Sequence, residues 1–246
     1  MLSMNNTRRD FEQAQPQIAV LPVGALEQHG SHLPIGTDSM IAAEYAEQLA
    51  QHLDAFLLPT LAISSSIEHR KAIGTVYLRA DTLALVIRDI ADSLYSSGFK
   101  QLLLVNGHGG NYILKPAIRQ LNRDYADRQA EMEVVLLSGA IINAIGDDSP
   151  FKHPGSSDIH AGEKETSLIM HLRPDLVRQP VPDGGVLPEA DQSMLDYLDM
   201  TELCADGYWG YPDSATPEKG RLIAERFVPR AIDYLEKLKR LKASLR

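Results

Sequence analysis

Short apolar runs alternate along this chain with stretches that carry apolar residues at helical spacing. The apolar runs lie at residues 18–21, 56–58, 101–105 and 134–137. The helical stretches lie at residues 39–53, 82–97, 112–129 and 161–172, and from residue 217 onward. Strands that are apolar throughout are typical of a parallel sheet covered on both faces. The alternation therefore predicts an α/β fold, a three-layer α/β/α sandwich with a mostly parallel central sheet.

The chain of 246 residues is long enough to bury one large core, and no segment has the composition of a linker. We therefore expect one domain over residues 1–246, with residues 1–15 flexible. The single cysteine, Cys204, excludes an internal disulfide and is typical of a reducing compartment. No apolar run approaches the ~20 residues that span a bilayer, so we expect a cytoplasmic protein without a membrane partner. The net charge of −9 argues against binding to nucleic acid, because phosphate binding needs a basic surface.

Two carboxylates and an imidazole follow the apolar run at residues 18–21. Glu27 and His29 are two residues apart, so in extended backbone their side chains leave the same face. Asp38 comes after a loop that is long enough to fold back on them. Side chains of these types together suit a borderline divalent metal ion such as Zn, Mn or Fe. The alternative is a polar loop that caps the next helix at Thr37 or Asp38.

A glycine-rich turn, Asn106 to Asn111, follows the run at residues 101–105 and contains His108. In open α/β sheets, ligand sites form at the carboxyl ends of the strands, so this turn and the first cluster are expected to open on the same side. The turn could instead bind phosphate. It lacks both the spacing of a dinucleotide fingerprint and a Lys-Ser/Thr ending, so we rank that alternative below the metal interpretation.

A third cluster lies at residues 158–166, at the start of a predicted helix. Glu165 precedes three apolar residues by three, four and seven positions: Leu168, Ile169 and Leu172. It should therefore share their inward face, where a carboxylate is costly unless it is paired or bound to a metal. Glu163 and Lys164 fall elsewhere on the helix and are expected to be solvated. The alternatives are that Glu165 caps its own helix and that His160 is a hydrogen-bonded loop histidine.

Together these clusters provide the imidazoles and carboxylates for two divalent ions that share one carboxylate. Such a pair activates a water molecule and polarises a carbonyl group, and a nearby histidine, for which we select His160, can pass the proton to a leaving nitrogen. The implied reaction is hydrolysis of an amide C–N bond, although the same chemistry also permits ester or phosphoester cleavage. A serine hydrolase is excluded, because the chain has no Gly-x-Ser-x-Gly motif.

Four ordered motifs resemble those of the creatininase (creatinine amidohydrolase) family. They are Pro-Val-Gly-Ala-Leu-Glu-Gln-His-Gly at residues 22–30, Gly-Thr-Asp at 36–38, Asn-Gly-His-Gly-Gly-Asn at 106–111 and His-Ala-Gly-Glu-Lys-Glu-Thr-Ser at 160–167. The resemblance implies a three-layer α/β/α fold, a dinuclear metal centre, C–N hydrolase activity and often a homohexamer. By position it implies that Glu27, Asp38 and His108 bind one ion. It implies that His29 and the bridging Asp38 bind the other.

The chain departs from true creatininases at position 110, where their motif carries a glutamate and this chain has Gly110. We expect Glu165 to replace that carboxylate. The tryptophans that line the creatinine pocket are also missing. Residues 64–75, with Glu68-His69, and residues 207–210 instead resemble other branches of the family, which include mycofactocin-precursor peptidases and formamidopyrimidine-nucleotide deformylases.

We therefore expect a metal-dependent amidohydrolase that acts on a small-molecule or short-peptide amide other than creatinine. Three residues are candidates for contacts with the substrate: Glu68, Asn111 and Trp209. The first alternative is a precursor-peptide peptidase of the mycofactocin type. The second is a non-catalytic metal-binding or nucleotide-binding module.

Overall fold

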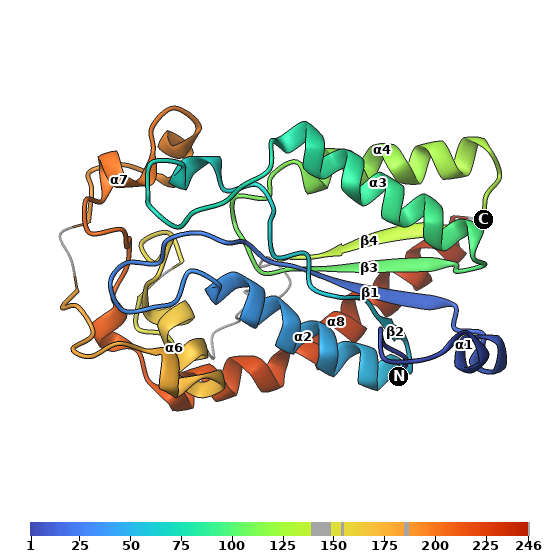
Figure 1. The fold of residues 1–246 in the computed structure, drawn as a ribbon, viewed down its shortest axis with the longest axis horizontal. Helices are drawn as coiled ribbons and strands as arrows, with labels where there is room; N and C mark the ends of the chain where they lie inside the picture. Colours follow the sequence, from blue (N-terminus) through green and yellow to red (C-terminus); the bar gives the residue numbers. More distant parts are fainter. Residues whose placement is uncertain (139–148, 154, 185–186, 246) are drawn as a thin grey trace.

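Four parallel strands form the central sheet of this protein, seen in a computed structural model that describes residues 1–138, 149–153, 155–184 and 187–245 (Figure 1). The strands are β1 (Ile18–Val23), β2 (Phe56–Leu57), β3 (Gln101–Asn106) and β4 (Glu133–Leu137). Their order across the sheet is β2-β1-β3-β4, so the two strands that precede the first two polar clusters are neighbours. Ile18 pairs with Gln101 and Val23 with Asn106, which brings β1 and β3 to an end at the same edge.

Helices cover both faces of the sheet (Figure 1). One face packs against α3 (Ala80–Ser96) and α4 (Leu114–Asp127), and the other against α2 (Thr37–Leu53), α6 (Glu163–Leu172) and α8 (Pro217–Ser244). Successive residues of a strand point to opposite faces. Accordingly, Ala19 and Leu21 belong to the core under α3 and α4, whereas Val20 belongs to the core under α2 and α8. The predicted three-layer α/β/α fold with a parallel sheet is confirmed.

Short elements occupy the connections. They are α1 (Arg8–Ala14), η1 (Ile67–His69), η2 (Pro174–Leu176), η3 (Gln192–Asp196), α7 (Met200–Leu203) and η4 (Pro212–Ser214). Residues 139–148, 154, 185, 186 and 246 lie outside the described residues.

The helix boundaries differ from the predicted ones in two places that matter. Helix α2 has Gly36 as its N-cap, so the predicted cap at Thr37 or Asp38 is wrong, and Asp38 lies in the first helical turn. Helix α3 begins at Ala80 with Arg79 as its N-cap, two residues before the start of the predicted helical stretch at residues 82–97. In α2 the early start leaves the Asp38 side chain to contact residues outside its own helix.

The N-terminal segment packs on the edge of the sheet. The N–H of Leu2 donates to the carbonyl of Ala55 at 3.1 Å. The ring of Phe11, in α1, meets the ring of Phe56 edge-on with 4.9 Å between the centroids. Residues 1–15 thus contain a helix and a strand-like contact, and their predicted flexibility stays a prediction.

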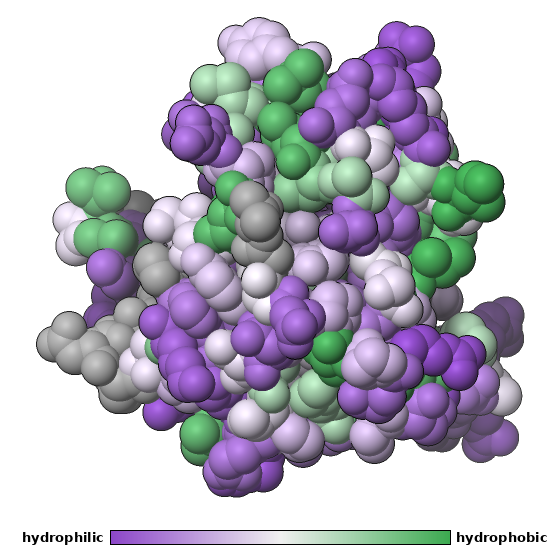
Figure 2. Space-filling view, turned by 90° about the vertical axis from the view of Figure 1, so that its left-hand side faces the viewer, coloured by the Kyte–Doolittle hydropathy of each residue, from purple (hydrophilic) through white to green (hydrophobic). Residues whose placement is uncertain are grey.

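The face beyond the carboxyl ends of the strands lies at the left of Figure 1, around α7 and the start of α6, and is turned toward the viewer in Figure 2. It is mostly hydrophilic, with hydrophobic side chains scattered in small groups. Within the described ranges, no helix has both the length and the apolar character needed to cross a membrane.

Candidate metal centre

Two glycines let the first turn of α2 lie against the ends of both central strands. A Cβ on Gly24 would collide with the backbone of Ser39, and one on Gly107 would press against the carbonyl oxygen of Asp38. Only a residue without a side chain permits such close backbone approach. Asp38 is therefore held directly beside the segments that follow β1 and β3. Its position near the N-terminus of a helix also favours a negative charge.

The loop after β1 folds back on itself and brings its polar side chains to Asp38. The N–H of Glu27 donates to the carbonyl of Ile35 at 2.9 Å, which closes the loop. The hydroxyl of Ser39 donates to the carbonyl of Ala25 at 2.9 Å. These contacts connect the two ends of the loop, so that Glu27 and His29 reach the first turn of α2.

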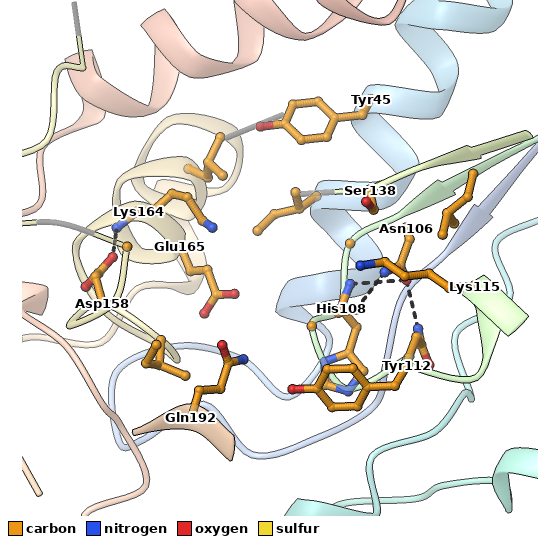
Figure 3. A pocket seen from close by; sticks show the side chains of 18 residues that line it. Tyr45, Asn106, His108, Tyr112, Lys115, Ser138, Asp158, Lys164, Glu165 and Gln192 are labelled. Atoms are coloured by element: carbon orange, nitrogen blue, oxygen red, sulfur yellow. Dashed lines mark hydrogen bonds between the residues drawn. The ribbon is translucent and has the colours of Figure 1, made fainter. Parts of the chain in front are cut away.

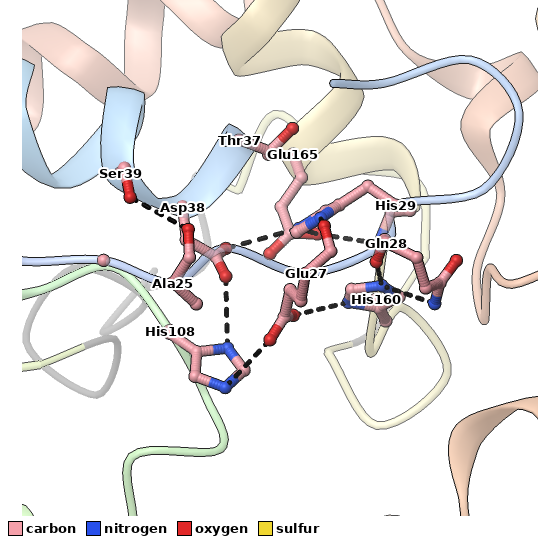
Figure 4. Close-up of polar contacts among 12 residues, drawn as sticks. Ala25, Glu27, Gln28, His29, Thr37, Asp38, Ser39, His108, His160 and Glu165 are labelled. Carbon is pink, nitrogen blue, oxygen red and sulfur yellow. Dashed lines mark hydrogen bonds and ion pairs between the residues drawn. The ribbon is translucent and has the colours of Figure 1, made fainter. Parts of the chain in front are cut away.

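All five side chains predicted as ligands lie together (Figure 4). The His108 ring lies between two carboxylates, with Nδ1 3.1 Å from Asp38 Oδ2 and Nε2 3.1 Å from Glu27 Oε2. His29 Nε2 is 3.4 Å from Asp38 Oδ1 and 3.8 Å from Glu165 Oε2. Asp38 thus lies close to both His29 and His108, as expected of a carboxylate shared by two metal ions. Ligand atoms of Glu27, His29 and Asp38 all lie within 4.8 Å of one another, which is close enough to hold one ion.

The hydrogen bond of His29 identifies the atom that could bind a metal. Its Nδ1 lies 3.1 Å from the carbonyl oxygen of Glu27, so Nδ1 carries the proton and donates. In the neutral ring the lone pair is then on Nε2, the atom that faces Asp38 and Glu165. A backbone carbonyl that holds the second ring nitrogen in this way is the usual support of a metal-binding histidine.

Buried polar atoms without a hydrogen-bond partner show that the pocket suits a cation. Among the described residues they include both carboxylate oxygens of Glu27, Nε2 of His29 and Oδ2 of Asp38. All three side chains are at most 1% exposed. A buried polar atom left without a partner costs about 1–3 kcal/mol, and these four converge on one place. The residues therefore fit divalent metal ions.

In the metal-free pocket, burial and the close contacts between carboxylates and imidazoles shift the pKa values of the ligand candidates. Burial raises the pKa of the Glu27 carboxyl to about 8. Burial also disfavours the charged His29 ring, but the Asp38 carboxylate overrides this effect and raises the pKa of His29 to about 9. Similarly, the Glu27 and Asp38 carboxylates outweigh burial and raise the pKa of His108. At neutral pH the metal-free pocket thus keeps protons on Glu27, His29 and His108, three of the proposed ligands.

Metal binding is therefore expected to displace protons. Because Glu27 and His29 titrate near pH 8 and 9, the apparent affinity for Mn²⁺ or Zn²⁺ should fall as the pH decreases below those values. Each displaced proton changes the affinity about tenfold per pH unit. Calorimetric titration between pH 6 and 9, in two buffers that differ in protonation enthalpy, measures both the affinity and the number of protons released. An affinity that does not change with pH would contradict these assignments.

Glu165 combines the two roles that the sequence left open. Its Oε2 accepts from the N–H of Ala161 at 2.7 Å, as a residue that caps its own helix would. The same oxygen faces His29. Glu163, which we expected to be solvated, is fully buried, so that expectation is wrong. Its carboxylate pairs with Lys219 of α8 and accepts from the N–H of Lys152 at 3.1 Å.

His160 is hydrogen-bonded and also reaches the centre. Its Nε2 lies 2.7 Å from the carbonyl oxygen of Gln28 and therefore donates a proton there. The unprotonated Nδ1 then faces Glu27 Oε1 at 3.6 Å. Burial, and next the nearby His29, lower the pKa of His160 well below its usual value, so the ring is neutral at pH 7. Backbone hydrogen bonds with Trp209, of 3.0 and 2.8 Å, hold this residue in place.

His69 is part of the site, and sequence analysis assigned it no role. The N–H of Gly30 donates to Gln28 Oε1 at 2.9 Å, which leaves Gln28 Nε2 as the donor to His69 Nδ1 at 2.9 Å. His69 Nε2 therefore carries the proton and faces Glu27 Oε1 at 3.4 Å. Burial lowers the pKa of His69 to about 4, so the neutral ring orients Glu27. Its position directly after Glu68 in a polar loop was the only signal in the sequence.

The three residues predicted to contact the substrate have different surroundings. Glu68 is buried beside His108, with 3.4 Å between Oε1 and Nε2. Asn111 accepts from the N–H of Ser65 at 3.1 Å and donates to Asn106 Oδ1 at 2.9 Å, so its amide joins two loops. Trp209 is 2% exposed and packs with Met200 and Cys204. Their contacts with a substrate stay a prediction.

A cavity of about 340 Å³ opens beside the centre (Figure 3). His108 and Glu165 form part of its wall, together with Tyr45, Tyr112, Lys115 and Lys164. A second space of about 30 Å³, large enough for a water molecule, is lined by Glu68, His69, His108, His160 and Glu165. The cluster therefore borders both a site of substrate size and a site of water size.

Comparisons with known proteins agree with this geometry. The creatininase family model, described as creatinine amidohydrolase, matches residues 4–235. The chain is 30% identical over 225 residues to the mycofactocin precursor peptide peptidase of Mycobacterium ulcerans, with 85% of this chain and 80% of that protein covered. It is 30% identical over 228 residues to the creatinine amidohydrolase of Pseudomonas putida, with 85% and 84% covered.

A solved structure described as "Creatininase Mn" superposes with a TM-score of 0.78 at 28% identity, and the match covers 96% of this chain and 98% of that one. The family model, the two relatives and this structure all match most of the chain. The resemblance seen in the four motifs is confirmed: this chain belongs to the creatininase family.

Proposed function

We propose that this protein is a metal-dependent amidohydrolase that cleaves the C–N bond of a small or peptide-derived amide. One observation supports the proposal most strongly: four buried, unpartnered atoms of Glu27, His29 and Asp38 converge beside His108 and Glu165, which line a cavity of about 340 Å³. Cavities of about 300–1,000 Å³ are typical of small-molecule sites. The same residues lie in the motifs that are shared with the creatininase family.

The centre would hold two divalent ions per chain, Zn, Mn or Fe. Glu27, Asp38 and His108 would bind one ion, and His29, Asp38 and Glu165 would bind the other; the close contacts among these side chains support this division. When bound, such ions polarise a carbonyl group and lower the pKa of water to near 7. The carboxyl of Asp38 holds the two imidazoles in a fixed relation, and the burial of the whole cluster excludes bulk water.

His160 is the proposed proton carrier. Its Nε2 is committed to the carbonyl of Gln28, so only Nδ1 can accept a proton from a water molecule beside Glu27. The lowered pKa makes the protonated ring a strong acid, which favours donation to the departing nitrogen. The space of about 30 Å³ that this ring lines provides room for the water.

A second candidate is a peptidase that trims a precursor peptide. This alternative is favoured by the similarity to mycofactocin precursor peptide peptidases over most of the chain.

The only tryptophan, Trp209, is buried and is not among the residues that line the cavity of about 340 Å³. The cavity therefore has no exposed indole for a flat ring such as creatinine.

A hydrolysis screen with the metal-loaded protein tests the proposal. Substrates should include creatinine, formamides, short amides and peptides. The proposal expects near two ions per chain by metal analysis and turnover of at least one amide. Bound metal without any turnover would favour a non-catalytic metal-binding module, and absence of bound metal would overturn the proposal.

Replacing His160 with alanine separates proton transfer from metal binding. We expect kcat to fall by about 10²–10⁴, the range of general acid–base catalysis, while the metal content stays at the wild-type value. The variant His52→Ala, an exposed histidine in the last turn of α2, serves as the control and should retain full activity. Loss of metal together with activity would instead identify His160 as a ligand.

We also propose a cytoplasmic location and a homo-oligomer, with a hexamer as the expected state for this family. Light scattering of the purified protein measures the assembly directly, and a monomer at micromolar concentration would overturn that part of the proposal.

A further inference from the structure

The space beside Gly110 is filled by the carboxylate of Glu68. A Cβ built on Gly110 would overlap Glu68 Oε1 and collide with His108 Nε2. The backbone of Gly110 is not in the left-handed region, so its conformation does not demand glycine. The requirement is steric: residue 110 must have no side chain because a carboxylate from another part of the chain occupies that volume.

Glu68 arrives there on a firmly held loop. It belongs to η1, and the residues on both sides are anchored to distant elements. Before it, the N–H of Ser65 donates to Asn111 Oδ1 at 3.1 Å. After it, Arg70 and Lys71 form ion pairs with the buried Asp199 at 3.0 and 2.7 Å. The side chain of Glu68 is therefore placed by the tertiary structure.

The carboxylate joins the donors of the metal centre. Oε1 lies 3.4 Å from His108 Nε2. Ligand atoms of Glu27, Glu68 and His108 all lie within 4.8 Å of one another, which is the spacing of a group that can hold an ion. Both oxygens of Glu27 in this group are fully buried and accept no hydrogen bond, so their lone pairs are available to a metal ion.

Charge balance supports the same assignment. Glu27, Asp38 and Glu165 would leave one positive charge uncompensated on two divalent ions in a buried site. A fourth carboxylate makes the centre neutral, and uncompensated buried charge is strongly unfavourable. The side chain that lies in position to provide the fourth carboxylate is Glu68.

We propose that Glu68 is a carboxylate of the metal centre, on the side of the ion held by Glu27 and His108, and that Gly110 is the residue that makes room for it. The inference rests on the proposed dinuclear centre. It assigns Glu68 to the metal and not to the substrate.

The variant Glu68→Gln keeps the shape of the side chain and removes its charge. Calorimetric titration of the metal-free protein with Mn²⁺ should show two binding steps for the wild type. In the variant, one step should weaken by about 10–100-fold, the range found when groups around a metal site are removed. The control Glu202→Gln removes an exposed carboxylate that pairs with Lys71, and it should leave both steps unchanged.

A second variant moves the carboxylate back to position 110. In the double variant Glu68→Gly, Gly110→Glu, the Glu68 carboxylate is removed and a glutamate at position 110 occupies the same space. The affinities of both Mn²⁺ binding steps should therefore return to within a few-fold of the wild-type values. The single variant Gly110→Glu, which forces two side chains into one space, should lower the thermal midpoint.

Two outcomes decide the inference. If Glu68→Gln binds two Mn²⁺ ions as tightly as the wild type, Glu68 is not part of the centre, whether or not the double variant folds. If the wild type itself binds no Mn²⁺ or Zn²⁺, the proposed function fails first. The two failures are therefore distinguishable in the same titration.

Discussion

The variant Asp38→Asn is expected to lose turnover almost completely while it retains the fold. Among the described residues, Asp38 is the carboxylate that lies close to both His29 and His108, at 3.4 and 3.1 Å. Asparagine has the same shape but no charge, so the residue can no longer bridge two cations. Lewis-acid catalysis is worth several kcal/mol, so kcat/KM should fall on the order of 10³-fold or more. Metal analysis should find fewer than two ions per chain.

The matched control is Asp92→Asn. Asp92 is a carboxylate of α3 on the other face of the sheet, where it accepts from the hydroxyl of Tyr125 at 3.0 Å and pairs with Arg128. This change should leave the metal content and kcat/KM as in the wild type. Circular dichroism and a cooperative melt would show that both variants are folded. If Asp38→Asn turned over substrate at the wild-type rate with two ions bound, the shared-carboxylate assignment would be wrong.

The second large effect is expected on stability. Removal of metal with a chelator should lower the melting temperature and abolish hydrolysis, and addition of Zn²⁺ or Mn²⁺ should restore both. A ligand at 100 times its Kd stabilises the folded state by about 2.7 kcal/mol per site. For a chain of this size each kcal/mol is about 2–4 °C, so one occupied site corresponds to a shift of about 5–10 °C. Differential scanning fluorimetry at a series of metal concentrations measures the shift.

Two controls make the stability test specific. Ca²⁺ prefers a cage made entirely of oxygen ligands and should stabilise the protein less than Zn²⁺ or Mn²⁺. The Asp38→Asn variant should melt below the metal-free wild type, because it removes the charge that pairs with the buried His29 and His108 rings, and it should respond little to metal. A melting temperature that is the same with and without either ion would contradict the assignment of the centre.

The residues closest in sequence to the strand ends could be assigned to a site without any coordinates. Glu27, His29 and Asp38 follow β1, and His108 follows β3. Parallel strands that are neighbours in a sheet end at one edge, so short segments after two such strands meet. The apolar runs that define those strands were long enough to be recognised, which is why the fold class followed from the same pattern.

Predictions failed where a residue's surroundings came from a distant part of the chain. Glu163 lies off the inward face that the helical spacing of α6 defines, yet it is fully buried because Lys219 of α8 covers and pairs with it. The cap predicted for α2 was wrong because Asp38 faces two histidines instead of its own backbone. In both cases the helix was predicted correctly and the partner of the side chain was not.

Local patterns in the amino-acid order were thus enough for the layers of the fold and for naming the five ligand candidates that the structure brings together. These features depend on strand and helix periodicity and on short distances along the chain. The placement of Glu68 and His69, the proton position on His160, and the need for glycine at position 110 depend on packing between segments 40 or more residues apart. Such contacts form only when the sheet has brought β1, β3, η1 and α6 to one edge, so no pattern within a single segment could predict them.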